Sequence, residues 1–212
     1  MLARERRMYP RLLQDYKSRK TPRQIMDTGL DREELLRLSN EYDNAYPWWT
    51  QKEKALGEQI KREKEVGREI LKEIIEWKFA TLPGRIKRTL NLISRHNDAF
   101  VRSITRRALA LPVNQCNRRI KELRRIMGIG ISLASVILTF YDPENYCIYD
   151  IHVIRERYGH EPKYMFASNK HYLRLLNDLR TQRKNLKLTV RTIEKALFKK
   201  NIGSRTPSRG EL

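Results

Sequence analysis

Cysteine is scarce in this sequence, and its scarcity excludes several kinds of site. Only Cys116 and Cys147 are present among 212 residues, and they lie far apart. Two distant cysteines form neither a paired zinc-binding motif nor a disulfide framework, and they cannot supply the four thiolates of an iron–sulfur cluster. We therefore expect both side chains to be buried structural residues, and the sequence implies no metal and no cofactor.

Long hydrophobic stretches are also absent. The sequence has no apolar run of about 18 residues, the length that a transmembrane helix needs. Its first residues, MLARERRMYP, lack the hydrophobic region of a signal peptide. We therefore expect a cytoplasmic protein without a membrane partner.

The alternation of apolar and polar residues that marks a β-strand is rare. Apolar residues recur instead at spacings of three and four, which is the pattern of amphipathic helices. The one strand-like run, YCIYDIHVI, follows Asp142 and Pro143 and fits equally well a loop that enters a helix. The sequence therefore predicts an all-α fold.

Capping residues and glycines divide the helical pattern into segments. Asp31 and Glu34 predict the first turn of one helix, and the capping box TQKE at 50–53 predicts that of the next. This second helix should be long, either unbroken or divided at Gly57 or Gly67. Further helices are predicted near 86–93 and 100–109, over 113–127, 131–141 and about 150–158, and as a pair within 168–200.

The length of the chain suits one compact unit. Within it, residues 1–50 are predicted to form a basic N-terminal arm and a helix, and residues 51–203 the main helical domain. Residues 204–212 should form a flexible tail. The role of the first segment stays open, with a wedge, a lid and a dimer contact as alternatives.

Acidic residues are few relative to basic ones. Lys and Arg number 45 against 25 Asp and Glu, which gives a formal net charge of +20 at pH 7. The excess is uneven: residues 81–130 carry 12 basic and 2 acidic side chains, whereas residues 131–150 carry three acids and no base. Such a charge favours a polyanionic partner, with nucleic acid as the leading candidate. A generally basic surface, as on a ribosome-associated protein, is the alternative.

A turn with paired glycines, IMGIGIS at 126–132, is the most specific motif. Apolar residues end one predicted helix before it, and the small Ala134 lets the next helix pack closely on the first. The glycines permit positive φ angles and leave backbone N–H groups exposed, where a phosphate oxygen can bind. Two arginines before the turn add attraction for a polyanion. The residues of this predicted phosphate grip are Arg124, Arg125, Gly128, Gly130, Ile131 and Ser132.

This segment, at 120–140, resembles the helix-hairpin-helix motif of DNA-binding proteins. The helix-hairpin-helix DNA glycosylase superfamily includes endonuclease III, the adenine glycosylases and the 8-oxoguanine DNA glycosylases. In it, a Gly/Pro-containing connection and a V-D-T-H-V-like run with the catalytic aspartate follow the hairpin. Here Asp142 and Pro143 lie in the connection, and IYDIHV at 148–153 is similar to that run. The resemblance covers residues 120–158, about a fifth of the chain. It implies a two-lobed helical fold with a cleft between the lobes.

The resemblance assigns the catalytic carboxylate to Asp150. Breaking a base–sugar bond builds positive charge on the deoxyribose, and a fixed carboxylate can stabilise this charge or activate the attacking water. An N-cap for the helix that begins near Ile151 is another role for Asp150, and the two roles can coexist. We expect His152 to orient the local backbone or to contact a phosphate. Arg155 should contact either DNA or a surface carboxylate.

One departure from the family concerns the nucleophile. Members that also cleave the DNA backbone have a lysine at the hairpin position that Ser132 occupies here, and serine cannot form their imine intermediate. The adenine glycosylases resemble this sequence in having serine there, which implies base excision by water. A lyase would need a displaced lysine. Lys78 is the leading candidate, because desolvation at the end of an apolar helix favours a neutral amine. A solvent-exposed Lys78 is the alternative.

The sequence therefore predicts a monomeric, nucleoid-associated DNA-repair enzyme that cleaves the N-glycosidic bond of a damaged base in double-stranded DNA. The alternatives are an abasic-site lyase that uses Lys78 and a non-catalytic helix-hairpin-helix DNA-binding protein. A flipped base would need aromatic or apolar walls, although core packing is the commoner role of such side chains. The candidates for these walls are Trp48, Trp49, Trp77, Tyr141 and Tyr149.

Overall fold

The structure is a computed structural model that describes residues 29–159 and 169–203. Within these residues it consists of helices and contains no strand, which confirms the all-α prediction. Most of the predicted basic arm and the predicted tail at 204–212 lie outside the described residues. In chain order, the helices are α2 (Arg32–Ala45), α3 (Pro47–Glu63), α4 (Arg68–Lys78), α5 (Pro83–Ile93), α6 (Asp98–Ala110), the 3₁₀ helix η2 (Val113–Gln115), α7 (Cys116–Leu123), α8 (Ile131–Tyr141), α9 (Ile151–Tyr158), α10 (Asn169–Leu186) and α11 (Val190–Ile202).

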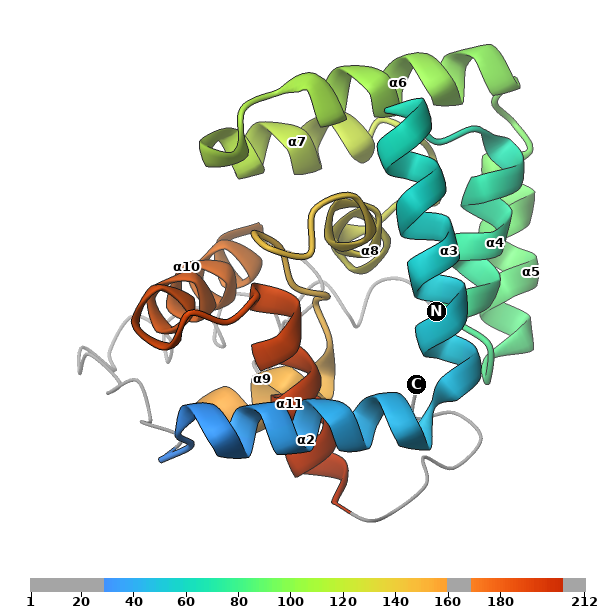
Figure 1. The fold of residues 1–212 in the computed structure, drawn as a ribbon. Coiled ribbons are helices and arrows are strands. Elements are labelled where there is room, and N and C mark those ends of the chain that lie inside the picture. Colours follow the sequence, from blue (N-terminus) through green and yellow to red (C-terminus); the bar gives the residue numbers. More distant parts are fainter. Residues whose placement is uncertain (1–28, 160–168, 204–212) are drawn as a thin grey trace, which may run out of the picture.

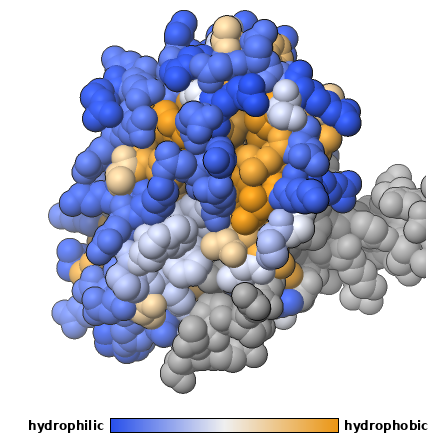
Figure 2. All heavy atoms as spheres, turned by 90° about the vertical axis from the view of Figure 1, so that its right-hand side faces the viewer, coloured by the Kyte–Doolittle hydropathy of each residue, from blue (hydrophilic) through white to orange (hydrophobic). Residues whose placement is uncertain are grey.

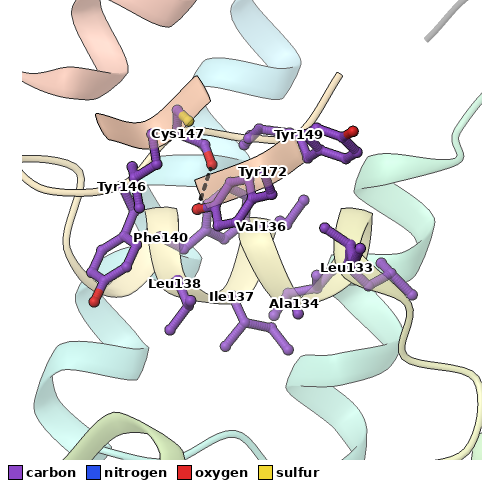
Figure 3. Close-up of a cluster of buried hydrophobic side chains, with 14 of the residues drawn as sticks. Leu133, Ala134, Val136, Ile137, Leu138, Phe140, Tyr146, Cys147, Tyr149 and Tyr172 are labelled. Carbon is purple, nitrogen blue, oxygen red and sulfur yellow. Dashed lines mark hydrogen bonds between the residues drawn. The ribbon is translucent and has the colours of Figure 1, made fainter. Parts of the chain in front are cut away.

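Helix α8 lies at the centre of the molecule, and the other helices surround it (Figure 1). Its residues 133–140 are all buried, which explains why apolar residues cover every side of this helix. Helices α3, α4 and α7 contact it. The loop after α8 returns along it, so that Tyr146, Cys147 and Tyr149 lie beside the helix in Figure 3. There the Tyr172 hydroxyl donates to the carbonyl oxygen of Cys147 at 3.1 Å.

The two ends of the described chain pack together. Helix α2 lies against α11, which also contacts α9 and α10, while α3 to α7 lie on other sides of α8 (Figure 1). Tyr42 of α2 and Phe198 of α11 form an edge-to-face pair with ring centroids 5.5 Å apart. This packing places α11 beside α9, whose N-cap is Asp150. No helix in the described part of the chain is long and apolar enough to span a membrane.

Two predicted helix starts have different outcomes. The Asp31 side chain accepts from the backbone N–H of Glu34 at 2.8 Å, which confirms the first turn of α2. The predicted start at Thr50 is wrong, because α3 already begins at Pro47. Proline suits the first position of a helix, where its missing N–H group has no partner to lose. The Thr50 hydroxyl donates instead to the side chain of Asp43 at 2.8 Å.

The two glycines of the predicted long helix also differ. A Cβ atom at Gly57 would lie 2.8 Å from the carbonyl oxygen of Phe140, so Gly57 lets α3 cross α8 closely without interrupting α3. The break falls at Gly67, which is the N-cap of α4. The strand alternative for the run that starts at Tyr146 is wrong, since this run is a buried loop followed by α9. The predicted helix 113–127 is shorter, because α7 ends at Leu123. Both cysteines are buried, as predicted.

Candidate active site

Lys78 and Asp150 form an ion pair inside the molecule. The Nζ atom of Lys78 lies 2.7 Å from Oδ2 of Asp150, and each side chain is only 10% exposed. Lys78 is the last residue of α4 and Asp150 precedes α9, so the two partners are 72 positions apart in the chain. The alternative of a solvent-exposed Lys78 is therefore wrong.

The start of α9 holds the Asp150 carboxylate. Its Oδ1 atom accepts from the backbone N–H of His152 at 2.9 Å, so the predicted N-cap role is confirmed. Burial disfavours the charged carboxylate, but the Lys78 ammonium and the His152 N–H outweigh it and hold the pKa of Asp150 below its ordinary value. Asp150 is therefore ionised at neutral pH although it is buried.

Two tryptophans fix the end of α4 next to Lys78. The Trp77 indole N–H donates to the carbonyl oxygen of Trp49 at 2.8 Å, and the Trp49 indole N–H donates to that of Trp77 at 3.1 Å. The Trp77 ring also packs edge-on against Phe140 of α8, with ring centroids 4.9 Å apart. These contacts join α3, α4 and α8, so the backbone that carries Lys78 is held in place.

A small pocket lies at the ion pair. It holds about 30 Å³ of free space, which is room for a water molecule but not for a nucleobase. Its lining combines the ion pair with aromatic rings and with two charged residues of α11. The lining residues are Tyr42, Trp49, Trp77, Lys78, Ile148, Asp150, Arg191, Glu194 and Phe198. Ser132 is not one of them.

Arg191 and Glu194 form a second buried ion pair in the lining of the pocket. Arg191 also donates from Nη2 to the carboxylate of Glu53 at 2.6 Å. The Glu194 carboxylate accepts from the backbone N–H of Ile148 at 3.3 Å. Ile148 lies two positions before Asp150 in the chain. Burial raises the pKa of Glu194, although Arg191 acts in the opposite direction. The pocket therefore holds two carboxyl groups whose pKa values are shifted in opposite directions, an arrangement typical of acid–base sites.

A short chain of hydrogen bonds joins the Asp150 loop to α8. The backbone N–H of Tyr149 donates to the Ser135 hydroxyl at 2.9 Å, and this hydroxyl donates to the carbonyl oxygen of Ser132 at 2.7 Å. The residue before Asp150 is thereby tied to the first turns of α8. The segment before α8 and the carboxylate thus belong to one connected structure.

The two glycines of the predicted hairpin have different conformations. Gly128 has a φ of +97°, and a Cβ atom there would lie 3.1 Å from Cβ of Leu92 and 3.2 Å from the carbonyl oxygen of Thr89 in α5. Gly130 has a φ of −90°, so the positive φ that glycine permits is not used at this position. It is the N-cap of α8, and a Cβ atom there would meet no other atom within 4 Å. Gly128 packs the turn on α5, whereas Gly130 leaves the start of α8 open.

The start of α8 offers backbone N–H groups. No side chain in the described part of the chain caps this helix, and the N–H groups of Ile131 and Ser132 have no partner within the helix. The turn itself is held in place, since the backbone N–H of Met127 donates to Nε2 of His96 at 2.9 Å. An uncapped helix start is positive and suits a phosphate oxygen.

Basic side chains lie on both sides of this turn. Arg124 and Arg125 are exposed; Arg124 donates to Asn169 at 3.0 Å, and Arg125 pairs with Glu122 at 2.9 Å. Helix α5 is free of acidic residues, as is the whole segment 77–97. Figure 2 shows the side of the molecule that carries α4 and α5, where hydrophilic side chains surround an apolar area. The exposed basic residues of α5 are Arg85, Lys87 and Arg88.

The remaining predicted site residues lie outside the pocket lining. His152 is buried; its Nδ1 atom lies 2.9 Å from Oδ1 of Asn201, and its ring packs edge-on against Phe198. This position between α9 and α11 fits the predicted role in orienting the backbone better than a phosphate contact. Arg155 is half-buried on α9. Of the predicted aromatic walls, Trp49 and Trp77 line the pocket, Tyr141 and Tyr149 do not, and Trp48 is 49% exposed.

No protein family model, curated protein or solved structure matches this chain. Among the described residues, no group of three His, Cys, Asp or Glu side chains is arranged to bind a metal ion. Sequence patterns did not identify Arg191 and Glu194, whose only local signal is a charged pair three positions apart among apolar residues of α11.

Proposed function

We propose that this protein is a DNA-repair enzyme that cleaves the N-glycosidic bond of a damaged base in double-stranded DNA. Asp150 is its catalytic carboxylate. The observation that carries the proposal is a buried, ionised carboxylate in an aromatic pocket, 18 positions after the hairpin residue Ser132. The spacing and the order of these features are those that the sequence resemblance implies for a DNA glycosylase.

A buried ion pair contributes little net stability to a folded protein. Removal of two charges from water costs several kcal/mol per ion, and apolar side chains of similar volume often serve stability as well or better. Lys78 and Asp150 form such a pair at the wall of a pocket. Charged groups whose environment is perturbed in this way concentrate at functional sites. This supports a chemical role for the pair.

Asp150 suits both parts of the proposed reaction. As the bond between C1′ and the base lengthens, positive charge develops on the deoxyribose, and a carboxylate in a water-poor pocket stabilises that charge. A water molecule beside Asp150 can then attack C1′ while its proton passes to the carboxylate. The bonding electrons leave with the base. Because Ser132 lies outside the pocket lining, the hairpin itself supplies no nucleophile.

The turn between α7 and α8 supplies the proposed DNA contact. The open start of α8 binds a phosphate, and Arg124, Arg125 and the basic side chains of α5 attract the rest of the backbone. Contacts of this kind position the DNA without reading its sequence. In this proposal, α2 and α9–α11 form one lobe and α3–α8 the other. The pocket lies between the lobes, since Tyr42 and Phe198 come from one and Trp49 and Trp77 from the other.

A flipped nucleotide must enlarge the pocket before its base can enter. The present space of about 30 Å³ is too small, so side chains of the lining must move when the substrate binds. The Trp49 side chain is the candidate for this movement because it is only partly buried, whereas Trp77 is buried; this movement would break the hydrogen bond from the Trp49 indole to the carbonyl oxygen of Trp77. Both rings then offer stacking surfaces for the base.

Release of a free base from duplex oligonucleotides tests the proposal. Each duplex of a panel carries one damaged base, and strand cleavage is measured before and after treatment with alkali. Cleavage that requires alkali identifies base removal without cleavage of the backbone. A non-catalytic DNA-binding protein would bind the same duplexes and release no base from any of them.

A further inference from the structure

We infer that a cavity beside the connection from α10 to α11 binds a phosphomonoester, carried either by a free molecule of nucleotide size or by a DNA strand end. The cavity holds about 390 Å³ of free space, which lies within the usual range of small-molecule sites. Its wall carries three cationic side chains and one carboxylate. The lining residues are Glu144, Arg183, Lys184, Lys187, Leu188 and Thr189. They do not line the pocket at Asp150, so the inference stands independently of the proposed repair reaction.

The cavity is also separate from the proposed DNA contact at the hairpin. The hairpin precedes α8 and Glu144 follows it, so the two sites lie toward opposite ends of a helix that is about 16 Å long. The connection between α10 and α11 and helix α5 lie on opposite sides of the molecule in Figure 1. A ligand of the cavity is therefore not the phosphate that the start of α8 is proposed to bind.

Arg183 is held at the wall of the cavity by two contacts. Its Nη2 atom donates to the carboxylate of Glu144 at 3.0 Å, and its Nη1 atom donates to Oδ1 of Asn145 at 3.1 Å. A guanidinium has five N–H donors, so further donors remain for a ligand. The carboxylate of the wall is thus already paired, and it holds the guanidinium in place.

Lys184 and Lys187 supply positive charge that the wall does not neutralise. Both side chains are exposed, and neither forms an ion pair with a described residue. Three cations against one carboxylate leave two positive charges in excess. A phosphomonoester carries a charge of about −1.5 to −2 near pH 7, whereas a phosphodiester carries a single negative charge. The charge of the cavity therefore matches a phosphomonoester better than the DNA backbone.

The backbone of Lys187 provides the matched control. Lys187 has a φ of +53°, a conformation that favours glycine and costs free energy for a lysine. Basic side chains near a helix C-terminus also interact favourably with the helix dipole, so a role in ending α10 is the alternative. Lys64 follows α3 in the same way, with a φ of +55°, but it does not line the cavity. A comparison of the two lysines separates ligand binding from helix ending.

Calorimetric titration of the full chain with adenosine monophosphate tests the inference. At low salt we expect one molecule to bind per chain, with a Kd of about 1 mM or tighter. Adenosine, which lacks the phosphate, should not bind measurably. The dinucleotide ApA, whose only phosphate is a diester, should bind at least about fivefold more weakly. The absence of saturable binding by adenosine monophosphate, or equal binding by ApA, would overturn the inference.

The variants Lys187→Gly and Lys64→Gly give a second test. Both introduce the residue that a positive φ favours, so both should fold with a melting temperature close to that of the wild type or above it. Lys187→Gly should bind adenosine monophosphate about tenfold more weakly, because it loses a charged donor. Lys64→Gly loses the same charge and should bind as the wild type does. Wild-type binding by Lys187→Gly, or the same loss in both variants, would contradict a site at this cavity.

Competition with DNA distinguishes the two sources of the phosphate. If the cavity binds a strand end, a short duplex with 5′-phosphates should displace adenosine monophosphate at a lower concentration than the same duplex with 5′-hydroxyl groups. Equal displacement by the two duplexes, or no displacement, would identify a free small molecule as the ligand. Both results support a phosphomonoester site, and they differ only in what carries the phosphate.

Discussion

The Nζ atom of Lys78 lies 2.7 Å from Oδ2 of Asp150, and this contact joins the end of α4 to the start of α9. Both side chains also line the pocket. The same two side chains therefore influence the stability of the fold and the chemistry of the site. Substitutions at this pair should separate the two effects.

Removal of one partner should cost more stability than removal of both. Lys78→Met leaves the Asp150 carboxylate buried without its cation, which costs about 3–5 kcal/mol of unfolding free energy. The double variant with Asp150→Asn leaves no buried charge at this place and should recover much of that loss. Urea denaturation of the single and double variants measures the difference. Additive losses would show that the pair is not coupled.

The contribution of Asp150 to stability should disappear in acid. Its pKa is lower in the folded protein than in the unfolded chain, so the stabilisation is fully present above about pH 4, the ordinary pKa of aspartate. It is lost as the pH falls through the lower, folded value. The unfolding free energy of the wild type relative to Asp150→Asn, measured from pH 7 to pH 2.5, should therefore decline only in the acidic part of this range. A constant difference would contradict the assigned direction of the pKa shift.

The two hairpin glycines should respond to substitution in different ways. Gly130→Glu should fold normally, because its φ is ordinary and a Cβ atom there meets open space. The added carboxylate should weaken DNA binding about tenfold or more, since it would face the bound phosphate. Gly130→Ser is the control, because it also replaces the glycine with a residue that has a Cβ atom but adds no charge. This variant should bind DNA almost as tightly as the wild type does. Equal binding by Gly130→Glu would show that no phosphate lies at the start of α8.

Gly128→Ala should instead damage the fold. Its φ of +97° is unfavourable for alanine, and the new Cβ atom would press on Leu92 and on the Thr89 carbonyl of α5. We expect a loss of about 1–3 kcal/mol of unfolding free energy, measured by thermal or urea denaturation. A variant as stable as the wild type would contradict this packing of the turn on α5.

His96 should control the rigidity of the hairpin. His96→Phe keeps an aromatic ring next to Phe100, with which His96 is stacked, but it removes the acceptor for the backbone N–H of Met127. Hydrogen exchange of the Met127 amide should then accelerate, and DNA affinity should fall. His96→Gln retains a side-chain acceptor and should show smaller effects. Unchanged exchange in His96→Phe would mean that this hydrogen bond does not hold the turn.

The sequence predicts a helix boundary correctly where nearby residues such as glycine and proline determine it. Helix α8 has the predicted bounds 131–141, because a glycine precedes a largely apolar segment and a proline follows it. Both Pro47 and Thr50 are suitable residues for the start of a helix, and the sequence pattern favours Thr50. In the structure α3 starts at the earlier of the two, Pro47. Gly57 was a candidate break, whereas its actual role depends on a crossing with α8 that no local pattern encodes.

The residues of the site also fall into two groups: those that local sequence identifies and those that only the packing of the helices brings to the pocket. Asp150 was identified because its neighbours form a recognisable run, and Lys78 because it ends an apolar helix. Their contact spans 72 positions and depends on how α4 and α9 meet. Arg191 and Glu194 reach the pocket only because α11 packs against α2 and α9, and that packing decides which side of α11 is buried.

Base release by the wild type and by Asp150→Asn, measured on the same damaged duplexes with protein in excess, is the most direct test. Asparagine preserves the cap of α9 but leaves the Lys78 ammonium without its carboxylate, so the variant should be less stable than the wild type. Circular dichroism checks that it is folded at the assay temperature, and the folded variant should bind the duplex as tightly as the wild type or more tightly. We predict that the wild type releases at least one damaged base and that the variant is slower by about two orders of magnitude or more. Equal rates for the two proteins would contradict the catalytic role of Asp150.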